Sequence, residues 1–425
     1  MLRSSQTAWT RLFVLVAAAA IIFVGIGGSA AAAPASAKSG IQIGVEGPMT
    51  GIYAEVGAGF WQGARAAAAE INAEGGLLGG RKLVLTQADD VSDPADAIPA
   101  IKKLIDVNHI IALDGPNSTV LPTIEPILTQ HHIPTMFQGG TTNFDSNTNQ
   151  WIWRPSPSDS QLGVAMAAYA LKKGYKTAAM MFSSVASAQT LSGIVSHTYT
   201  KNGGKIVDQE TIQPGATSYR SEVLNVVNAH PDVIFTQVDP STAAPLFTDF
   251  AQVNNLSIPF IGSDLTAGSD FITAVTPKVA NKALVSIQGS TSAGPGAKPF
   301  LKYYRKLFHA QPVAGANYSY DAIMELALAI QRAGSTKSKL FNAAITTVCN
   351  PPGTKVSDWA TGLKDIKAHK KIHFVGAGGP AGYNKHHNSF GTFDAFRSDT
   401  SGNLKVVASL SVATMKKASQ GKLKP

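Results

Sequence analysis

The side chains best placed to bind a small molecule follow two predicted strands. The segment 114–119 follows a strand expected at 110–113, and the loop 138–142 follows one at 133–137. Ligands of open α/β sheets lie beyond the carboxyl ends of the strands, so both loops face the expected site. Ser118 supplies a hydroxyl group ahead of a predicted helix whose first N–H groups are unpaired, an arrangement suited to a carboxylate. Alternatively, Ser118 only caps that helix, which stabilises it by about 1 kcal/mol.

Residues for catalysis are not arranged in any pattern that we recognise. The sequence contains no G-x-S-x-G, Walker A or H-E-x-x-H motif. Its one cysteine, Cys349, has no adjacent base in the segment Thr347-Val348-Cys349-Asn350-Pro351-Pro352. Because nucleophilic catalysis needs an activated nucleophile, we expect a protein that is not an enzyme.

Two further patterns suggest a metal or a cofactor. Histidines are paired at 131–132 and 386–387, and His369 precedes His373 by one helical turn, but no carboxylate stands beside them at ligand spacing. Solvated histidines are the alternative that we favour, with no metal site. The glycine-rich segment 376–382 resembles a dinucleotide loop but opens no helix, so we expect a turn there and no cofactor.

Composition places the chain among ordinary globular proteins. Of its 425 residues 44% are hydrophobic and 15% are charged, which excludes a disordered chain, a coiled coil and a multi-spanning membrane protein. The length predicts two domains, with three as the alternative. One cysteine cannot form an intramolecular disulfide. The net charge of +9 comes from scattered lysines, so we expect a solvated surface and no nucleic-acid partner.

The N-terminus has the pattern of a secretory signal. Arg3 and Arg11 precede an apolar run at 12–24, and small residues follow as far as Ala37. This order predicts a signal peptide at 1–37, with cleavage after Ala33 or an uncleaved anchor as alternatives. We therefore expect an exported, periplasmic or cell-surface protein.

Strands and helices alternate twice along the rest of the chain, which predicts two parallel sheets covered by helices on both faces. The first series has strands at 41–45, 83–85, 110–113 and 133–137, with helices at 57–74, from Asp93 onward, and at 119–130. The second has strands at 177–182, 205–211, 233–236 and 259–261, with helices at 159–173, 189–202, 219–229 and 243–254. A Gly/Pro/Ser-rich run at 289–296 indicates a crossing between lobes, before helices at 298–308 and 321–333 and extended segments at 390–396 and 404–410.

The sequence resembles the periplasmic leucine/isoleucine/valine-binding proteins, the type I substrate-binding components of ABC importers. The opening segment 41–51 carries the resemblance, together with Gly63-Ala64-Arg65, Glu70-Ile71-Asn72, Gly75-Gly76 and Asp89-Asp90. Tyr320-Asp321-Ala322, Asn350-Pro351-Pro352-Gly353 and the segment 375–380 extend it over nearly the whole mature chain.

The resemblance implies two Rossmann-like α/β lobes, each a parallel sheet flanked by helices, joined by a three-strand hinge. We expect a first lobe of residues 38–155 plus 287–372 and a second of 156–286 plus 373–425, with crossings near Pro155, Ser286 and His373.

The resemblance also implies roles for particular residues. Ser118, Gly140 and Thr141 match positions that hold an amino-acid carboxylate, and Asp264 matches the acid that pairs with the ligand ammonium. We expect four more residues at the ligand site: Asn117, Tyr53, Gln189 and Asp239. The chain departs from the family where Val56 replaces an aromatic residue and where the segment 183–187 replaces an aspartate, a tyrosine and a glycine.

These patterns predict a monomeric receptor that closes on an amino-acid-like solute and delivers it to the membrane permease of an ABC importer. The departures leave an amide, a short carboxylate or an aromatic acid open as the ligand. A ligand-sensing domain that feeds a signalling partner is the alternative to transport.

Overall fold

A computed structural model describes residues 39–51, 53–290 and 295–423. The expected signal peptide lies outside the described residues, as do four positions of the predicted crossing at 289–296. Within the described segments, no helix has both the length and the apolar character needed to cross a bilayer.

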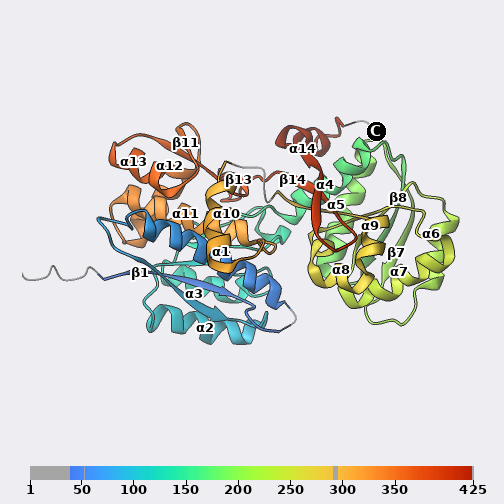
Figure 1. The fold of residues 1–425 in the computed structure, drawn as a ribbon, viewed down its shortest axis with the longest axis horizontal. Coiled ribbons are helices and arrows are strands. Elements are labelled where there is room, and N and C mark those ends of the chain that lie inside the picture. The colour runs from blue at the N-terminus through green and yellow to red at the C-terminus, as the bar shows by residue number, and fades with distance from the viewer. Residues whose placement is uncertain (1–38, 52, 291–294, 424–425) are drawn as a thin grey trace, which may run out of the picture. The chain divides into compact units, whose positions relative to one another are not determined.

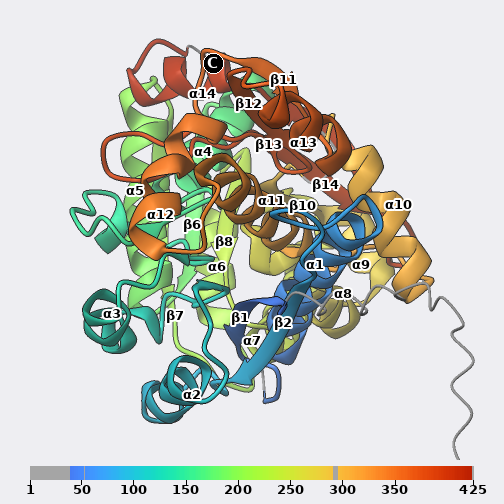
Figure 2. The ribbon, with the colours of Figure 1, turned by 90° about the vertical axis from the view of Figure 1, so that its left-hand side faces the viewer.

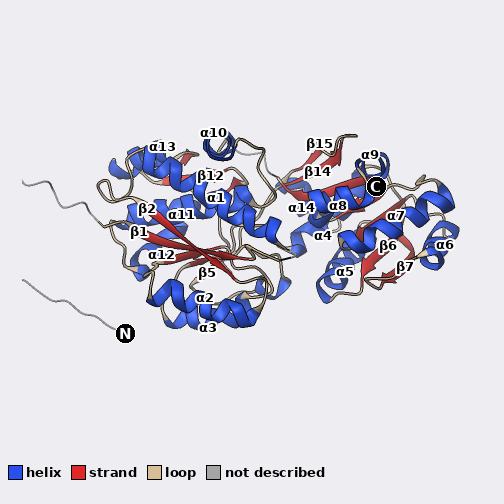
Figure 3. Ribbon diagram, turned by 60° about the horizontal axis from the view of Figure 1, so that its bottom comes forward, coloured by secondary structure: helices blue, strands red, loops and turns tan. Residues whose placement is uncertain are grey.

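The first lobe contains a sheet of five parallel strands in the order β2-β1-β3-β4-β5. These strands are β1 (Ile41–Gly47), β2 (Leu83–Asp89), β3 (Ala112–Asp114), β4 (Thr135–Met136) and β5 (Ile152–Trp153). Between them run α1 (Ala54–Ala73), α2 (Pro94–Asp106), α3 (Leu121–Gln130) and the short 3₁₀ helix η1 (Thr142–Phe144). Helix α1 covers one face of the sheet, and α2 and α3 cover the other (Figure 3). The predicted parallel α/β architecture is confirmed.

Local sequence determines where these helices begin and end. The Asp93 carboxylate accepts a hydrogen bond of 2.8 Å from the Ala95 N–H, and Pro94 occupies the first helical position of α2. Helix α1 ends before Gly75 and Gly76, which both have positive φ angles, and the Gly76 N–H donates to the Ile71 carbonyl at 2.8 Å. The predicted helix end at 74 and the predicted helix start at Asp93 agree with these positions to within one residue.

Segments late in the chain complete the first lobe. They are α10 (Ala297–Phe308), α11 (Ala316–Ala333), α12 (Ser338–Cys349), β11 (Thr354–Val356), α13 (Trp359–Lys367), β12 (Ile372–Gly376) and β13 (Gly379–Pro380). In Figures 1 and 2 the orange helix α11 lies beside the blue helix α1. The two backbones can approach closely because Gly63 has no side chain. A Cβ atom at this position would lie 2.0 Å from the Ala316 carbonyl oxygen.

A buried carboxylate connects three of these helices. Glu70 of α1 is 2% exposed and accepts hydrogen bonds from the Tyr320 hydroxyl of α11 at 2.5 Å and from the Trp359 N–H of α13 at 2.7 Å. Burial raises its pKa, although both hydrogen bonds act in the opposite direction. The late segments are therefore an integral part of the first core.

The second lobe contains a sheet of seven strands in the order β15-β14-β10-β9-β8-β6-β7. Its strands are β6 (Thr177–Ser183), β7 (Lys205–Ile212), β8 (Val233–Gln237), β9 (Phe260–Gly262), β10 (Leu284–Gly289), β14 (Phe393–Ser398) and β15 (Leu404–Leu410). Among the described strands, β14 pairs antiparallel with both β10 and β15, and the other pairs in this sheet are parallel.

Helices cover both faces of the second sheet. One face packs against α4 (Asp159–Lys172), α5 (Ala186–Lys201) and α14 (Val412–Ser419). The other packs against α6 (Arg220–Asn228), α7 (Pro240–Asn254), α8 (Ser269–Val275) and α9 (Pro277–Ala283), and the 3₁₀ helix η2 (Asp264–Ala267) precedes α8. The strand at 284–289 and the helices at 277–283, 338–349 and 359–367 were not predicted.

Two of the expected lobe limits fall inside strands. The limit at 286 divides β10, which pairs with β9 and β14 of the second sheet. The limit at 372 divides β12, whose Phe374 is buried in the first core together with Tyr383. We therefore propose that the second crossing follows Gly289 and that the third lies near residue 390.

Candidate functional site

A cavity of about 340 Å³ is lined by residues from both lobes. Its walls include segments that follow the carboxyl ends of four parallel strands: Gln138 and Gly140 after β4, residues 156–159 after β5, Asp239 after β8 and Asp264 after β9. Because ligands of α/β sheets bind beyond these strand ends, this cavity is the candidate binding site.

Asp159 contributes a carboxyl group to the polar lining. It is the first residue of α4, whose N-terminus Ser158 caps by accepting from the Gln161 N–H. Its own N–H donates to the Gly140 carbonyl oxygen at 2.8 Å, and a Cβ atom on Gly140 would lie 2.0 Å from its Oδ1 atom. Burial, assisted by the negative charge of Asp264, raises the pKa of Asp159 to about 7.

Asp264 approaches the cavity from the second lobe. Its side chain remains exposed, and its Oδ1 atom accepts a hydrogen bond of 3.0 Å from the Leu265 N–H. Burial of the carboxyl group raises the pKa of Asp264, although the hydrogen bond from the Leu265 N–H acts in the opposite direction. Helix α8 begins at Ser269 with no side-chain cap, so Asp264 does not cap this helix.

Asp239 uses its carboxylate within its own helix. Its oxygens accept hydrogen bonds from the Thr242 N–H at 3.0 Å, the Thr242 hydroxyl at 2.6 Å and the Ser241 hydroxyl at 2.5 Å. Burial acts to raise its pKa, but these hydrogen bonds prevail and lower it. Asp239 therefore contributes a stable negative charge to the wall of the cavity.

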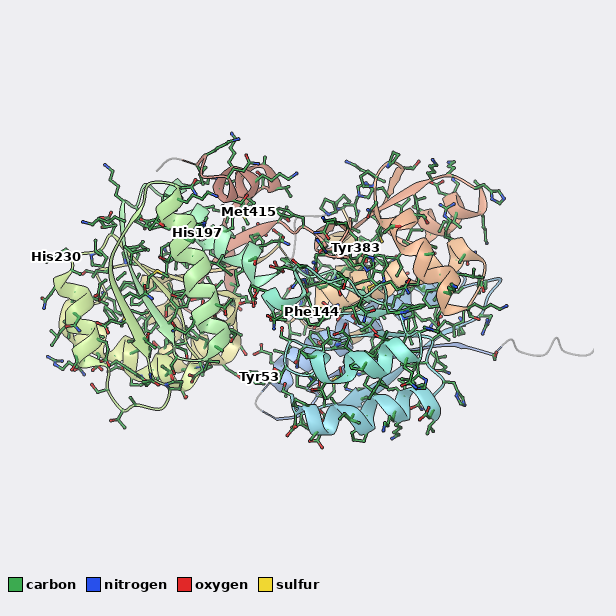
Figure 4. All side chains as sticks on the ribbon, turned by 180° about the vertical axis from the view of Figure 1, so that it is seen from behind. Tyr53, Phe144, His197, His230, Tyr383 and Met415 are labelled. Carbon is green, nitrogen blue, oxygen red and sulfur yellow. The ribbon has the colours of Figure 1, made fainter. Side chains whose placement is uncertain are left out.

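Aromatic side chains form much of the apolar wall: Tyr53, Phe60, Phe271, Tyr318 and Phe393. Tyr53 precedes α1 and is 48% exposed (Figure 4). Gly289 is required where Tyr318 approaches, because a Cβ atom there would lie 1.7 Å from the Tyr318 hydroxyl oxygen. The cavity thus combines acidic groups with aromatic surface.

The structure brings four of the eight predicted site residues to this cavity: Tyr53, Gly140, Asp239 and Asp264. The other four do not line it. The Ser118 hydroxyl instead accepts a hydrogen bond of 3.1 Å from the Thr141 N–H, which joins the two predicted loops. Gln189 donates to the Ser183 carbonyl oxygen at 2.7 Å. Whether these four residues bind a ligand stays a prediction.

In the structure Asn117, and not Ser118, accepts the hydrogen bonds ahead of α3. The neighbouring Asn117 accepts hydrogen bonds from the Thr119 N–H at 2.8 Å and the Val120 N–H at 3.3 Å, and therefore satisfies the donors ahead of α3. Ser118 orders the second loop instead, because its bond to Thr141 holds that segment beside the first.

Several residues of the lining were not predicted: Glu55, Asp159, Asp270, Gln288 and Asn317. Asp159 follows the end of β5 by six positions and Ser118 follows the end of β3 by four, so both lie beyond the carboxyl end of a strand. The sequence Ser158-Asp159 is also typical of a helix start, and that pattern alone does not indicate that Asp159 lines a binding site.

The histidines make other contacts. The His387 ring stacks on Trp153 with ring centres 3.8 Å apart, and His132 lies 4.9 Å from Trp151. His386 Nδ1 and the Asn147 carbonyl oxygen are 3.0 Å apart. Across the described parts of the chain, no group of three or more His, Cys, Asp or Glu residues is arranged to hold a metal ion.

The glycine-rich segment forms the predicted turn. Gly376 pairs with Gly379 in the antiparallel ladder of β12 and β13. The Asp321 carboxyl group accepts from the N–H groups of Ala377 at 2.7 Å and Gly378 at 2.8 Å, so these N–H groups of the loop already have a partner within the chain. Cys349 is buried, and burial raises the pKa of its thiol.

Comparison with known proteins gives one family and several relatives. Residues 40–390 match the family described as periplasmic binding protein. An amino acid binding protein of Pseudomonas aeruginosa is 26% identical over 304 residues, which cover 70% of this chain and 80% of that protein. The Leu/Ile/Val-binding protein homolog 1 of Brucella suis is 26% identical over 329 residues, covering 76% and 84%.

Solved structures share the fold. The branched-chain amino acid transporter substrate binding protein LivJ of Streptococcus pneumoniae, in complex with isoleucine, has a TM-score of 0.70 at 20% identity and covers 87% of this chain and 99% of its own. A solute binding protein of an ABC transporter from R. palustris, in complex with benzoate, has a TM-score of 0.67 at 19% identity and covers 87% and 96%.

Proposed function

Because the chain belongs to the periplasmic binding protein family, we propose that it is an exported receptor that captures an amino-acid-like solute and delivers it to the membrane permease of an ABC importer. One observation carries the proposal: the cavity at the strand ends is lined by residues of both lobes. A ligand there contacts both lobes at once, so its binding energy favours the closed arrangement.

Closure is the mechanism that we infer. A hydrogen bond of 3.1 Å from the Ser269 hydroxyl to Glu55 Oε1 joins the start of α8 to the start of α1, at the edge of the same cavity. A ligand that adds contacts beside this bond lowers the free energy of the closed form more than that of the open form. The permease then recognises the closed receptor, which acts as a monomer and performs no catalysis.

An amine-bearing solute fits the polar lining. Asp159 and Asp264 lie near enough for the charge of one to raise the pKa of the other, and an ammonium group between them would favour both carboxylates in their charged form. The relatives include an amino acid binding protein and proteins solved with isoleucine and with benzoate. The acidic lining favours the amino acid over the benzoate-like acid as a ligand of this chain.

The function is tested by a thermal-shift screen of amino acids, amides, amines and aromatic acids, followed by small-angle X-ray scattering. A ligand at 100 times its Kd stabilises the folded state by about 2.7 kcal/mol. We expect at least one solute to raise the melting temperature and to decrease the radius of gyration. If no class of solute raises the melting temperature, the receptor function is wrong; if a bound solute leaves the radius unchanged, closure is wrong.

A further inference from the structure

The charge of the cavity is opposite to that of the whole chain. Its lining includes five acidic residues: Glu55, Asp159, Asp239, Asp264 and Asp270. None of the described residues that line it is a lysine, an arginine or a histidine. The chain as a whole has a net charge of +9, so this concentration of negative charge is a local feature of the site.

Most of these carboxylates have no cationic partner. In the described segments, the ion pairs are those of Asp145 with Arg154, Asp365 with Lys370, and Asp399 with Lys405. Arg154 is the cation whose charge acts on Asp159, but its guanidinium donates to Asp145 and to the Thr141 carbonyl oxygen. Two carboxylates that face one cavity without a cation repel each other, and a bound cation removes that repulsion.

One buried acceptor atom gives an independent indication of a donor-bearing ligand. Asn317 lines the cavity and is 1% exposed, yet its Oδ1 atom has no hydrogen-bond partner among the described residues. Because an unsatisfied buried amide oxygen is costly, this position favours a ligand that brings an N–H donor. The hydroxyl groups of Ser156 and Tyr318, which also belong to the lining and have no partner among the described residues, can donate as well as accept and so do not distinguish between ligand classes.

The expected carboxylate cradle is already engaged. Ser118 and Thr141 hydrogen-bond to each other and do not line the cavity. The Asp159 carboxylate lies against Gly140, the one cradle residue that does line it. An acidic ligand group placed beside Gly140 would therefore meet a carboxylate of the protein and be repelled by it.

From these contacts we infer that the cavity binds an organic cation, an ammonium or guanidinium compound of net positive charge, with its cationic group between Asp159 and Asp264. The inference rests on the proposed receptor function and names its ligand class. The aromatic wall then packs against the apolar body of the ligand, and a ring face there attracts the cation as well. We therefore expect an amino acid with an uncharged side chain to bind more weakly than the corresponding amine, which lacks the carboxylate.

The test compares matched compounds by calorimetry. Isoamylamine, leucine and isocaproate share one carbon skeleton and carry an amine, both groups and a carboxylate, respectively. Agmatine with arginine and cadaverine with lysine form two further pairs. We expect each amine to bind about ten-fold or more tightly than its parent amino acid, isocaproate not to bind, and affinity for amines to fall as salt rises.

Variants assign the effect to the cavity. We expect Asp264→Asn and, separately, Asp159→Asn to weaken amine binding by about ten-fold or more, and Asp96→Asn, an exposed residue of α2, to leave it unchanged. Melting temperatures measured without ligand identify any variant that fails to fold.

Three results decide the inference. Amines that bind more tightly than their parents and lose affinity in the two variants support it. Leucine or isocaproate binding more tightly than isoamylamine overturns it and leaves the receptor function intact. No binding by any amine, amino acid, amide or aromatic acid overturns both.

Discussion

The buried carboxyl group of Asp114 makes the stability of the first lobe depend on pH. Asp114 is the last residue of β3, has no exposed surface, and accepts a hydrogen bond of 2.7 Å from the Gln138 side-chain amide, while its Oδ2 atom has no partner among the described residues. Burial raises its pKa from 3.8 to about 7. The folded state therefore keeps a proton that the unfolded state loses at lower pH.

The sign of the effect follows from proton counts. Between the two pKa values the folded state holds more protons than the unfolded state, so the free energy of unfolding decreases as pH rises. The slope is about 1.4 kcal/mol per pH unit, which amounts to about 3 kcal/mol between pH 5 and the folded pKa of about 7. Above that pKa the contribution of Asp114 becomes constant.

Asp114→Asn removes this titration while keeping the shape of the side chain. The new amide oxygen can still accept from Gln138, and the Ser319 hydroxyl, which has no partner among the described residues, is available to its N–H group. We expect the free energy of unfolding of the variant, relative to the parent, to increase by about 3 kcal/mol from pH 5 to pH 8.

The assay is urea denaturation followed by tryptophan fluorescence, because the described tryptophans, at 61, 151, 153 and 359, all lie in the first lobe. The control is Asp89→Asn in β2. Burial acts to raise the pKa of Asp89, but hydrogen bonds from Thr50 and Val91 prevail and lower it, so it is ionised in both states over this range. A difference between Asp114→Asn and the parent that stays constant from pH 5 to pH 8 would refute the reasoning.

The remaining predictions concern export, one loop and one helix contact. Secreted protein should begin near Lys38, and an intact mass that retains residues 1–37 contradicts this. Ser118→Ala should lower the free energy of unfolding by about 1 kcal/mol, because the Thr141 N–H loses its acceptor. The same variant should leave the Kd of the ligand unchanged. Weaker binding of the ligand in calorimetry would instead indicate that Ser118 belongs to the binding site. Gly63→Ala should destabilise the first lobe by about 3 kcal/mol or more, since its Cβ would meet the Ala316 carbonyl oxygen at 2.0 Å. The control Gly193→Ala, where nothing lies within 4 Å in helix α5, should instead stabilise the protein by about 0.5–1 kcal/mol, and equal melting temperatures for the two variants would contradict the argument.

The architecture was predictable because its signals are local. Alternating apolar segments of strand and helix length predict a parallel α/β sheet wherever they occur, and caps such as Asp93 and Gly75-Gly76 mark helix ends within a few residues. The helices α12 and α13 follow no such alternation. They pack on α11 and β12, so their position depends on tertiary contacts that sequence spacing does not contain.

The part of the binding site that could be predicted consists of residues that follow the carboxyl ends of strands. Gly140, Asp239 and Asp264 line the cavity because each follows the carboxyl end of a strand. Ser118 meets the same criterion but is engaged by Thr141, a residue 23 positions away in another loop. Asp159 was not predicted because its place in the sequence, directly after the helix cap Ser158, is explained by the start of α4 alone. Only the fold places its carboxyl group against Gly140.

The contact between α1 and α11 affects the order in which the protein can be assembled. Helix α1 exposes its glycine and alanine face until α11 arrives, more than 240 residues later in the chain. A chain that emerges from its N-terminus, from a ribosome or through a membrane pore, therefore presents an incomplete first lobe while the whole strand series β6 to β10 passes. Loop closure over that length is slow, so the early segment needs protection from aggregation during this interval. Moving the chain ends to the crossing after Gly289 would place α10 to α13 ahead of β1 and shorten this delay.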